Sequence, residues 1–433
     1  MPDQPFAAPH SHIAFPFCGL GCDDLSPARR KGRIAVDARD CDHAEVNFGI
    51  ALSAPETSPR IAGVTASLDK ALHRVGALLD QSNLPLFAGL SGDLVDIRGA
   101  LRLAARSGGA IDHRNGAALI SSLSVLEERG WIVTSLGETR NRADLVVLVG
   151  NGLTKRFPRL KERILAPKAR LHAEIRATVV EIRTAGESTD PSVGKTDETA
   201  LNPQPGGDIS LRPGQLRDFI AVLRSRLSNR TLDSNRFPDA ELLAERLKTA
   251  AYPVIAFAAS DLQSEPHPDL AVRALADMVR QLNQSGRAAL LPLGGADGET
   301  SAHQASAWHT GFSVRQTFHA GVPKYEPRRG DTRRMLDSGG ADLLVWISTL
   351  SDQPPPDTTV PTLVLGHPAM RLEREPDVFV PLAVPGVHRA GAVHRGDGLA
   401  LLPLSAIVEN KLPESGAVFA RLLELVAETE QPC

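Results

Sequence analysis

The chain has 433 residues, of which 42% are hydrophobic and 23% charged, and its formal net charge is −3. This composition is typical of a globular protein, and the length indicates two or three domains because one core rarely serves more than about 250–300 residues. The sequence lacks a basic stripe for nucleic acid, and no apolar run reaches the roughly 18–20 residues of a membrane helix. The N-terminus has no secretory signal and four cysteines are too few for a disulfide scaffold, so we expect a cytoplasmic protein.

Three cysteines near the N-terminus form the first informative pattern. Cys18 and Cys22 are spaced as C-x-x-x-C, and Cys41 follows further along. An iron–sulfur cluster takes four thiolates, often from a C-x-x-C-x-x-x-C run plus one distant cysteine. In that template the first ligand falls at position 15, where this chain has Phe15. We therefore expect residues 1–62 to be a small, irregular or β-rich module with a degenerate cluster site, ending in a linker.

Strand and helix patterns alternate after this module and predict a first α/β domain over 63–250. Ser67 is a suitable N-cap for the first helix, and a polar stretch rich in Pro and Gly at 186–208 predicts a surface loop. The predicted strands are 84–90, 110–112, 131–135, 144–149 and 171–182. The predicted helices are 67–79, 94–106, 117–129, 215–227 and 239–250.

A second alternating block predicts another α/β domain over 251–405, followed by a C-terminal helix and tail over 406–433. Its predicted strands are 253–259, 288–293, 342–347, 362–366 and 377–382, with a helix at 270–283. Repeated strand, loop and helix imply that each half is a doubly wound, mostly parallel sheet.

Four stretches in a fixed order resemble the B subunit of formylmethanofuran dehydrogenase, a molybdopterin- and tungstopterin-dependent oxidoreductase. They are PFCGLGCDD at 16–24, LGETRNRAD at 136–144, WHTGF at 308–312 with GVP at 321–323, and DVFVPLAVPG at 377–386 followed by Gly391 and Arg395. The resemblance runs from about residue 15 to 404. It implies a molybdopterin-oxidoreductase-like fold for the cysteine module and the two halves.

This chain departs from the redox members at two ligand positions. In them, a cysteine or selenocysteine after a Gly-Gly-x-Ile-Asp strand binds the metal of the pterin cofactor. The resemblance puts that position at or next to Ala118, and a methyl group cannot ligate molybdenum or tungsten. Phe15 removes one cluster ligand in the same way.

The two losses resemble a non-redox offshoot, the formyltransferase/hydrolase complex of methylotrophic bacteria. That complex moves a formyl group from formyl-tetrahydromethanopterin to a methanofuran-type carrier and hydrolyses it to formate. The resemblance implies a non-catalytic, structural B subunit without a cofactor of its own. Its partners would be the A-, C- and D-type subunits, with the carrier reached through them, and neither nucleic acid nor membrane.

The resemblance also implies a vestigial cofactor cleft. Its candidate residues are His113, Arg114, Asn115, Ala118, Glu138, Asn141, Arg142 and Asn151. The side chains at 113–115 are candidates to occupy the cleft. Asn141 and Arg142 are suited to a phosphate or a pterin ring; alternatively, Arg142 and Glu138 pin the loop before the strand at 144–149.

Several alternatives stay open. Cys18, Cys22 and Cys41 are free thiols left over from the ancestral fold, or they hold a three-thiolate iron–sulfur cluster, or they bind zinc. The alternative function is that of an active formylmethanofuran dehydrogenase B subunit with a tungsto- or molybdopterin and an iron–sulfur cluster. A third is a stand-alone α/β enzyme acting on a phosphorylated small molecule.

Overall fold

The structure is a computed structural model that describes residues 12–30, 33–165, 177–184, 208–230, 236–294 and 297–426. The chain divides into two compact units, Met1–Ala117 with Gly295–Cys433 as unit 1 and Ala118–Gly294 as unit 2. In sequence, unit 2 is therefore an insertion into unit 1. The predicted boundary between 250 and 251 lies inside unit 2, because the strand that follows it pairs with the strand at 145–149.

Unit 1 is built on a nine-stranded sheet in the order β13-β12-β6-β5-β14-β15-β16-β3-β4. The strands from β6 to β16 are parallel, and the two at each edge are antiparallel to their inner neighbours. From β5 the chain moves to β6 on one side and later returns to β14 on the other, so the topological switch point lies between β5 and β14. The bounds are β3 Arg60–Ile61, β4 Val64–Thr65, β5 Pro85–Ser91, β6 Ala110–Ile111, β12 Gln316–His319, β13 Val322–Tyr325, β14 Leu343–Ser348, β15 Thr362–Gly366 and β16 Val378–Pro381.

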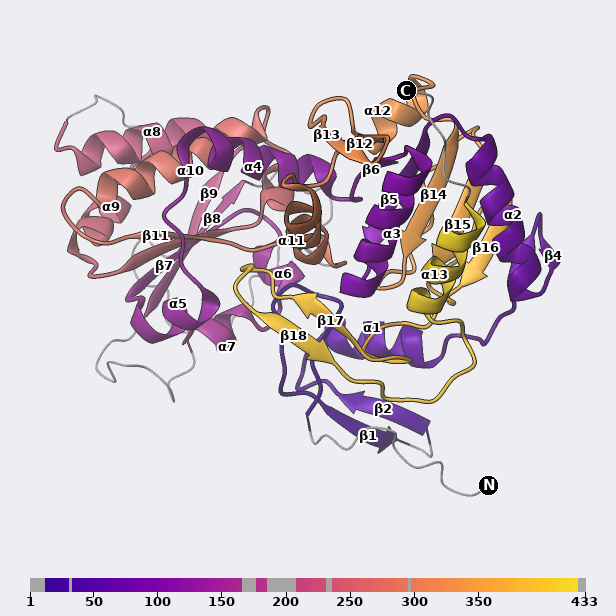
Figure 1. Ribbon diagram of the computed structural model, residues 1–433. Helices are drawn as coiled ribbons and strands as arrows, with labels where there is room; N and C mark the ends of the chain where they lie inside the picture. Colours follow the sequence, from indigo (N-terminus) through magenta and orange to yellow (C-terminus); the bar gives the residue numbers. More distant parts are fainter. Residues whose placement is uncertain are drawn as a thin grey trace. The chain divides into compact units, whose positions relative to one another are not determined.

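Helices α2 (Leu68–Gln81), α3 (Leu94–Ser107) and α13 (Ser415–Leu425) lie side by side over one face of this sheet (Figure 1). The Ser67 hydroxyl accepts a hydrogen bond from the backbone of Lys70, so the predicted N-cap of α2 is confirmed. The other face of the sheet buries a cluster that includes Trp346 of β14 and Met335 of α12 (Thr332–Asp337). Helix α11 (Glu299–Thr310) packs against α3.

The N-terminal module of unit 1 contains a hairpin, β1 (Ser26–Arg30) and β2 (Arg33–Asp37), and a helix, α1 (Asp42–Leu52). The sequence did not predict α1. Only Ala44, Phe48 and Ala51 form its buried face, and the apolar residues Val46, Ile50 and Leu52 lie off that face, so the sequence shows no clear helical period. A second hairpin, β17 (Gly391–His394) and β18 (Leu401–Leu404), completes the sheet elements of this unit.

Unit 2 is a five-stranded, fully parallel sheet in the order β11-β10-β7-β8-β9. Its first strand, β7, is central, so its switch point lies between β7 and β10. The strands are β7 Leu145–Val149, β8 Thr178–Thr184, β9 Asp208–Leu211, β10 Pro253–Phe257 and β11 Ala289–Pro292. The helices are α4 Gly116–Arg129, α5 Leu136–Arg142, α6 Leu153–Arg156, α7 Leu160–Leu165, α8 Leu216–Leu227, α9 Asp239–Thr249 and α10 Pro268–Leu282, with a 3₁₀ turn, η2, at Ala259–Leu262.

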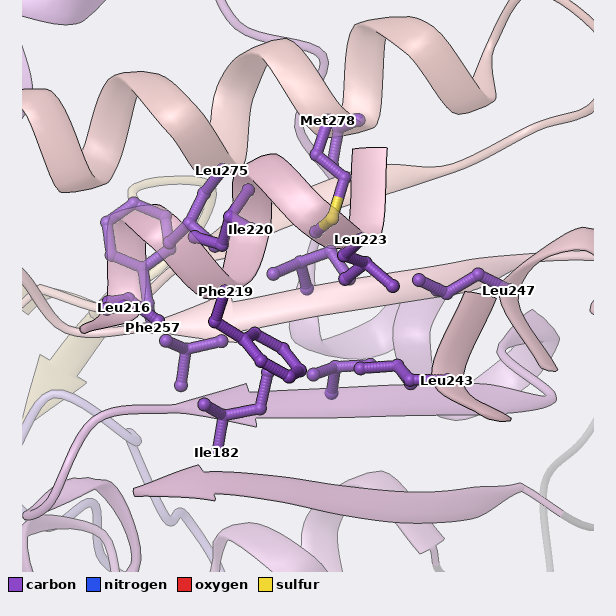
Figure 2. Packing of buried hydrophobic residues seen from close by; sticks show 14 of the residues in the cluster. Ile182, Leu216, Phe219, Ile220, Leu223, Leu243, Leu247, Phe257, Leu275 and Met278 are labelled. Carbon is purple, nitrogen blue, oxygen red and sulfur yellow. The ribbon is translucent and has the colours of Figure 1, made fainter. Parts of the chain in front are cut away.

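The sheet of unit 2 is covered on both faces, as fully parallel sheets generally are. Figure 1 draws α8, α9 and α10 on one side and α5 and α7 on the other. Figure 2 shows Phe219 and Leu223 of α8 packed against Ile182 of β8 and Met278 of α10. The helices predicted at 215–227, 239–250 and 270–283 are confirmed as α8, α9 and α10. Their apolar faces belong to the buried cluster of this unit.

Two local predictions differ from the structure, at 131–135 and 136–142, and others extend beyond the described residues. The segment 131–135 makes only an isolated bridge, Val133 to Leu290, and the block at 136–142 is helix α5 because the Ser135 side chain caps it. The predicted strand at 171–182 is described only from residue 177. The predicted loop at 186–208, apart from Asp208, and the predicted tail at 427–433 lie outside the described residues. No helix in the described part of the chain combines the length and hydropathy needed to cross a membrane.

Candidate functional site

The carboxyl ends of β5 and β14 form the switch point of unit 1, where open α/β sheets commonly bind ligands. Here the main chain closes the crevice. The Ser91 carbonyl accepts hydrogen bonds from the backbone N–H groups of Thr349 at 2.7 Å and Leu350 at 3.0 Å. Gly298 packs so closely on Gly92 that a Cβ atom at position 298 would overlap the Gly92 carbonyl oxygen.

A buried ionic network lies beside this closed crevice. Arg389 donates from Nη2 to Asp93 Oδ1 and Asp96 Oδ1 at 2.9 Å each, and from Nη1 to Asp93 Oδ2 at 3.0 Å. The three side chains are at most 5% exposed. Ser415 Oγ lies 3.3 Å from Arg389 Nη2, and the Thr349 hydroxyl donates to Asp96. The network thus connects the β5–α3 turn with β14, with α13 and with the segment before β17.

The network sets one guanidinium against two buried carboxylates, so the carboxylates outnumber the positive charge beside them. Burial, together with the neighbouring Asp93 charge, raises the pKa of Asp96 to about 6, although Arg389 acts in the opposite direction. Asp93 and Asp96 also form a capping box at the start of α3, which satisfies backbone donors there. With their oxygens engaged internally, these carboxylates hold the fold together and offer nothing to a ligand.

The predicted cleft residues at 113–115 lie together at the same edge of unit 1, directly after β6. The Asn115 backbone donates to His113 Nδ1 at 3.0 Å, and His113 Nε2 lies 3.3 Å from the Asp297 carbonyl oxygen, so Nε2 carries the proton. Arg114 Nη1 donates to Asp297 Oδ2 at 3.0 Å and to Ser351 Oγ at 2.9 Å. Burial lowers the pKa of His113 to about 4, so its ring is neutral at physiological pH.

Asn115 completes this set by donating from Nδ2 to Glu299 Oε2 at 3.1 Å. The polar groups of residues 113–115 are therefore bonded to the turn before α11 and to the end of β14. They satisfy one another within unit 1 and do not converge on an open space.

Asp112, immediately before this segment, belongs to a further buried contact. Its Oδ1 accepts from Arg315 Nε at 3.2 Å, and its Oδ2 accepts from the backbone and hydroxyl of Thr332 at 2.9 Å each. Burial raises the pKa of Asp112 to about 6, against the opposing charge of Arg315. The carboxylate ties β6 to the start of α12.

The remaining cleft candidates belong to unit 2. Glu138 and Arg142 form an ion pair at 2.7 Å, one turn apart on α5, and the Arg142 guanidinium lies 5.4 Å from the Tyr252 ring centroid. Asn141 lies on the same helix and is partly exposed. Ala118 is buried in the first turn of α4.

Asn151 follows β7 at the switch point of unit 2. Its side chain donates to the Thr184 carbonyl, and its Oδ1 accepts from the Thr184 backbone at 2.6 Å, which links the ends of β7 and β8. Asp261 accepts from the Gly152 backbone at 3.2 Å and from Arg156 at 2.9 Å. This switch point, too, has its polar groups paired within the chain.

The cysteine module buries three thiols and a cluster of aromatic rings. Cys18, Cys22 and Cys41 are buried, and none of the three is in a disulfide bond. Burial raises the pKa of the Cys18 thiol to about 12, and the other two thiols add to this shift. Phe15 is fully buried, with its ring centroid 5.6 Å from those of Phe17 and Phe48.

These donors do not fit the metal groups that the family resemblance implies. A phenyl ring at 15 and a methyl group at 118 offer no lone pair, and a thiol with so high a pKa stays protonated unless a metal displaces the proton. Within the described ranges, no three side chains among His, Cys, Asp and Glu are placed to hold a metal ion.

Sequence reasoning missed most of the buried polar side chains. Asp93 and Asp96 had a readable signal, since two acids three residues apart before a predicted helix are typical of a capping box. Arg389 and Arg315 had none, because their partners lie hundreds of residues away in the chain.

Comparisons with known proteins agree with the sequence motifs, although no protein-family model matches the chain. Over 336 residues the chain is 29% identical to the B subunit of the formyltransferase/hydrolase complex Fhc of Methylorubrum extorquens, an alignment that covers 77% of this chain and 87% of the relative. The chain is thus similar in sequence to the Fhc B subunit over most of both lengths. This finding confirms the predicted resemblance.

Relatives with lower sequence identity are named as subunits of a redox enzyme. The chain is 22% identical over 407 residues to the B subunit of tungsten-containing formylmethanofuran dehydrogenase 2 of Methanocaldococcus jannaschii, with 90% of this chain and 91% of the relative covered. The identity is thus lower for the dehydrogenase than for the Fhc B subunit.

The fold has a solved counterpart. A chain in the crystal structure of the formyltransferase/hydrolase complex FhcABCD from Methylorubrum extorquens, in complex with methylofuran, superimposes with a TM-score of 0.71 at 25% identity. The match covers 85% of this chain and 98% of that one. The predicted fold class of doubly wound, mostly parallel α/β halves is confirmed.

Proposed function

We propose that this chain is the non-catalytic B subunit of a formyltransferase/hydrolase complex of one-carbon metabolism. The complex moves a formyl group from formyl-tetrahydromethanopterin to a methanofuran-type carrier and hydrolyses it to formate. In this proposal the chain works in the cytoplasm with A-, C- and D-type subunits, which carry out the chemistry and contact the carrier.

The similarity to the Fhc B subunit over most of both chains is the observation that carries this proposal. The donor chemistry supports it, because the two positions expected to supply metal ligands hold Phe15 and Ala118. A subunit without these donors keeps the fold of an oxidoreductase but does not transfer electrons.

The polar edge of unit 1 supports a structural role as well. We infer that His113, Arg114 and Asn115 occupy the space of the former cofactor cleft, since each is hydrogen-bonded to residues 297–299. In the same way, Asn151 and the Glu138–Arg142 pair serve the fold of unit 2. Such internal pairing fits a structural role, in which these side chains stabilise the fold and take no part in catalysis.

Co-expression with the A-, C- and D-type subunits of the same organism tests the proposal. We expect a tag on this chain to isolate all four in equal amounts, with formyl transfer and formate release. Omitting the chain should abolish assembly, while Arg114→Ala should leave the turnover of the assembled complex unchanged.

Elemental analysis of the same preparation separates the alternatives. The proposal expects neither tungsten nor molybdenum in proportion to this chain, and no iron–sulfur absorption. Stoichiometric metal with formate-dependent dye reduction would instead identify a working dehydrogenase. Activity of the chain expressed alone would identify a stand-alone enzyme.

A further inference from the structure

A hollow of about 470 Å³ lies in unit 1 at the edge opposite to the switch point. It is lined near the amino ends of β5 and β14, by Leu84 and Gly340, and by residues of β12, β13 and α12. Four basic side chains line it, and we call it the basic hollow: His319, Lys324, Arg329 and Arg334.

Only one carboxylate among the lining residues opposes these charges. Glu326 forms an ion pair with Lys324 at 2.6 Å, and this contact, with a smaller effect of the nearby Arg329 charge, lowers the pKa of Glu326. Arg329 and Arg334 are exposed, and neither makes an ion pair with a carboxylate of the described residues. The hollow therefore carries two guanidinium groups whose charge is not neutralised by direct contact with a carboxylate of that part of the chain.

Hydrogen bonds of the buried Arg315 hold the backbone that carries these guanidinium groups. Buried Arg315 donates to Asp331 Oδ2 at 2.5 Å and to the Pro327 carbonyl at 3.0 Å, and its own carbonyl accepts from the Glu326 backbone at 2.8 Å. Asp331 in turn caps α12, the helix that carries Arg334. Both guanidinium groups thus extend from a turn and a helix that one buried side chain holds in place, which reduces the ordering cost of binding.

We propose that the basic hollow binds an anion with two or more negative groups. Guanidinium forks match carboxylates and phosphates equally in geometry, and charge-assisted hydrogen bonds of this kind are about twice as strong as neutral ones. The lining also includes Leu84 and Met335, which place apolar surface beside the basic side chains. The site is separate from the switch point and does not depend on the proposed function.

Calorimetric titration of the full chain, with any subunits that co-purify, tests this site at about 0.15 M salt, where distant charges are screened. The probes are inorganic tripolyphosphate and a tetra-aspartate peptide, which distinguish a phosphate ligand from an acidic segment. In Arg329→Glu with Arg334→Glu, we expect the dissociation constant of the bound probe to rise about tenfold or more.

The matched control is Arg328→Glu with Arg333→Glu, which changes the same charge on the same turn and helix but at side chains outside the lining. It should change affinity less than about threefold, and thermal melting should show that both variants fold. The proposal fails if the wild-type chain binds neither probe, or if the two double variants weaken binding equally.

Discussion

Replacing Arg389 with methionine tests the buried network of unit 1 directly. The change leaves Asp93 and Asp96 fully buried without their counter-charge, and breaking such a pair costs about 3–5 kcal/mol. The matched control is Arg421→Met, because Arg421 is 42% exposed and pairs with Glu424 at the surface. This replacement should lower the free energy of unfolding by no more than about 1 kcal/mol. Urea unfolding gives both values when it is followed by tryptophan fluorescence, to which buried Trp346 on β14 contributes.

The pH dependence of this loss has a definite sign. In the wild-type fold the pKa of Asp96 is raised from 3.8 to about 6, so its contribution to stability is complete below pH 3.8 and is lost as the pH rises through 6. Arg389 lowers that pKa, so its removal raises the pKa of Asp96 further. The variant therefore loses additional stability as the pH rises above 6. The deficit of the variant should therefore be larger at pH 8 than at pH 5. A deficit below 1 kcal/mol at pH 8 (about a fivefold change in the folding equilibrium), or one independent of pH, would refute the reasoning.

Three further predictions concern packing and thiol chemistry. Gly298→Ala should cost about 2 kcal/mol or more, because φ is +73° and the new methyl group meets the Gly92 carbonyl, whereas Gly311→Ala on the same helix has open space and should cost about 1 kcal/mol; equal losses in urea unfolding would contradict this. Phe15→Ala should lower the free energy of unfolding by about 3–5 kcal/mol, and a loss under 1 kcal/mol would show that the aromatic cluster is not packed. Cys18 should resist a thiol-specific dye at pH 8, where its thiolate fraction is about one in ten thousand, and rapid labelling of the native chain would contradict the burial described.

The elements of the fold were predictable where local patterns are strong. The apolar run at 145–149 and the capped helix at 68–81 have signals within a few residues, and both are found at those places. The pairing of β10 with β7 was not predictable, since a run of β-branched residues does not specify which sheet it joins. That pairing moves residues 251–294 into unit 2.

In the candidate site, too, local features were predictable from the sequence and long-range contacts were not. Loss of ligands at Phe15 and Ala118 can be read from residue types alone. How the polar groups at 113–115 are satisfied depends on Asp297 and Ser351, which only the folded chain brings near. A carboxylate such as Asp93 has no sequence signal for its guanidinium partner, because that contact spans 296 positions.

The insertion of unit 2 within unit 1 determines the order in which the chain can fold during synthesis. Residues 118–294 leave the ribosome as a complete segment before β14, at 343–348, has been made. β5 emerges long before its neighbour β14, so one edge of it stays unpaired while the whole inserted unit is translated. We therefore expect unit 2 to reach its native state first. The incomplete sheet of unit 1 should meanwhile need chaperones to protect its unpaired strand edge against aggregation.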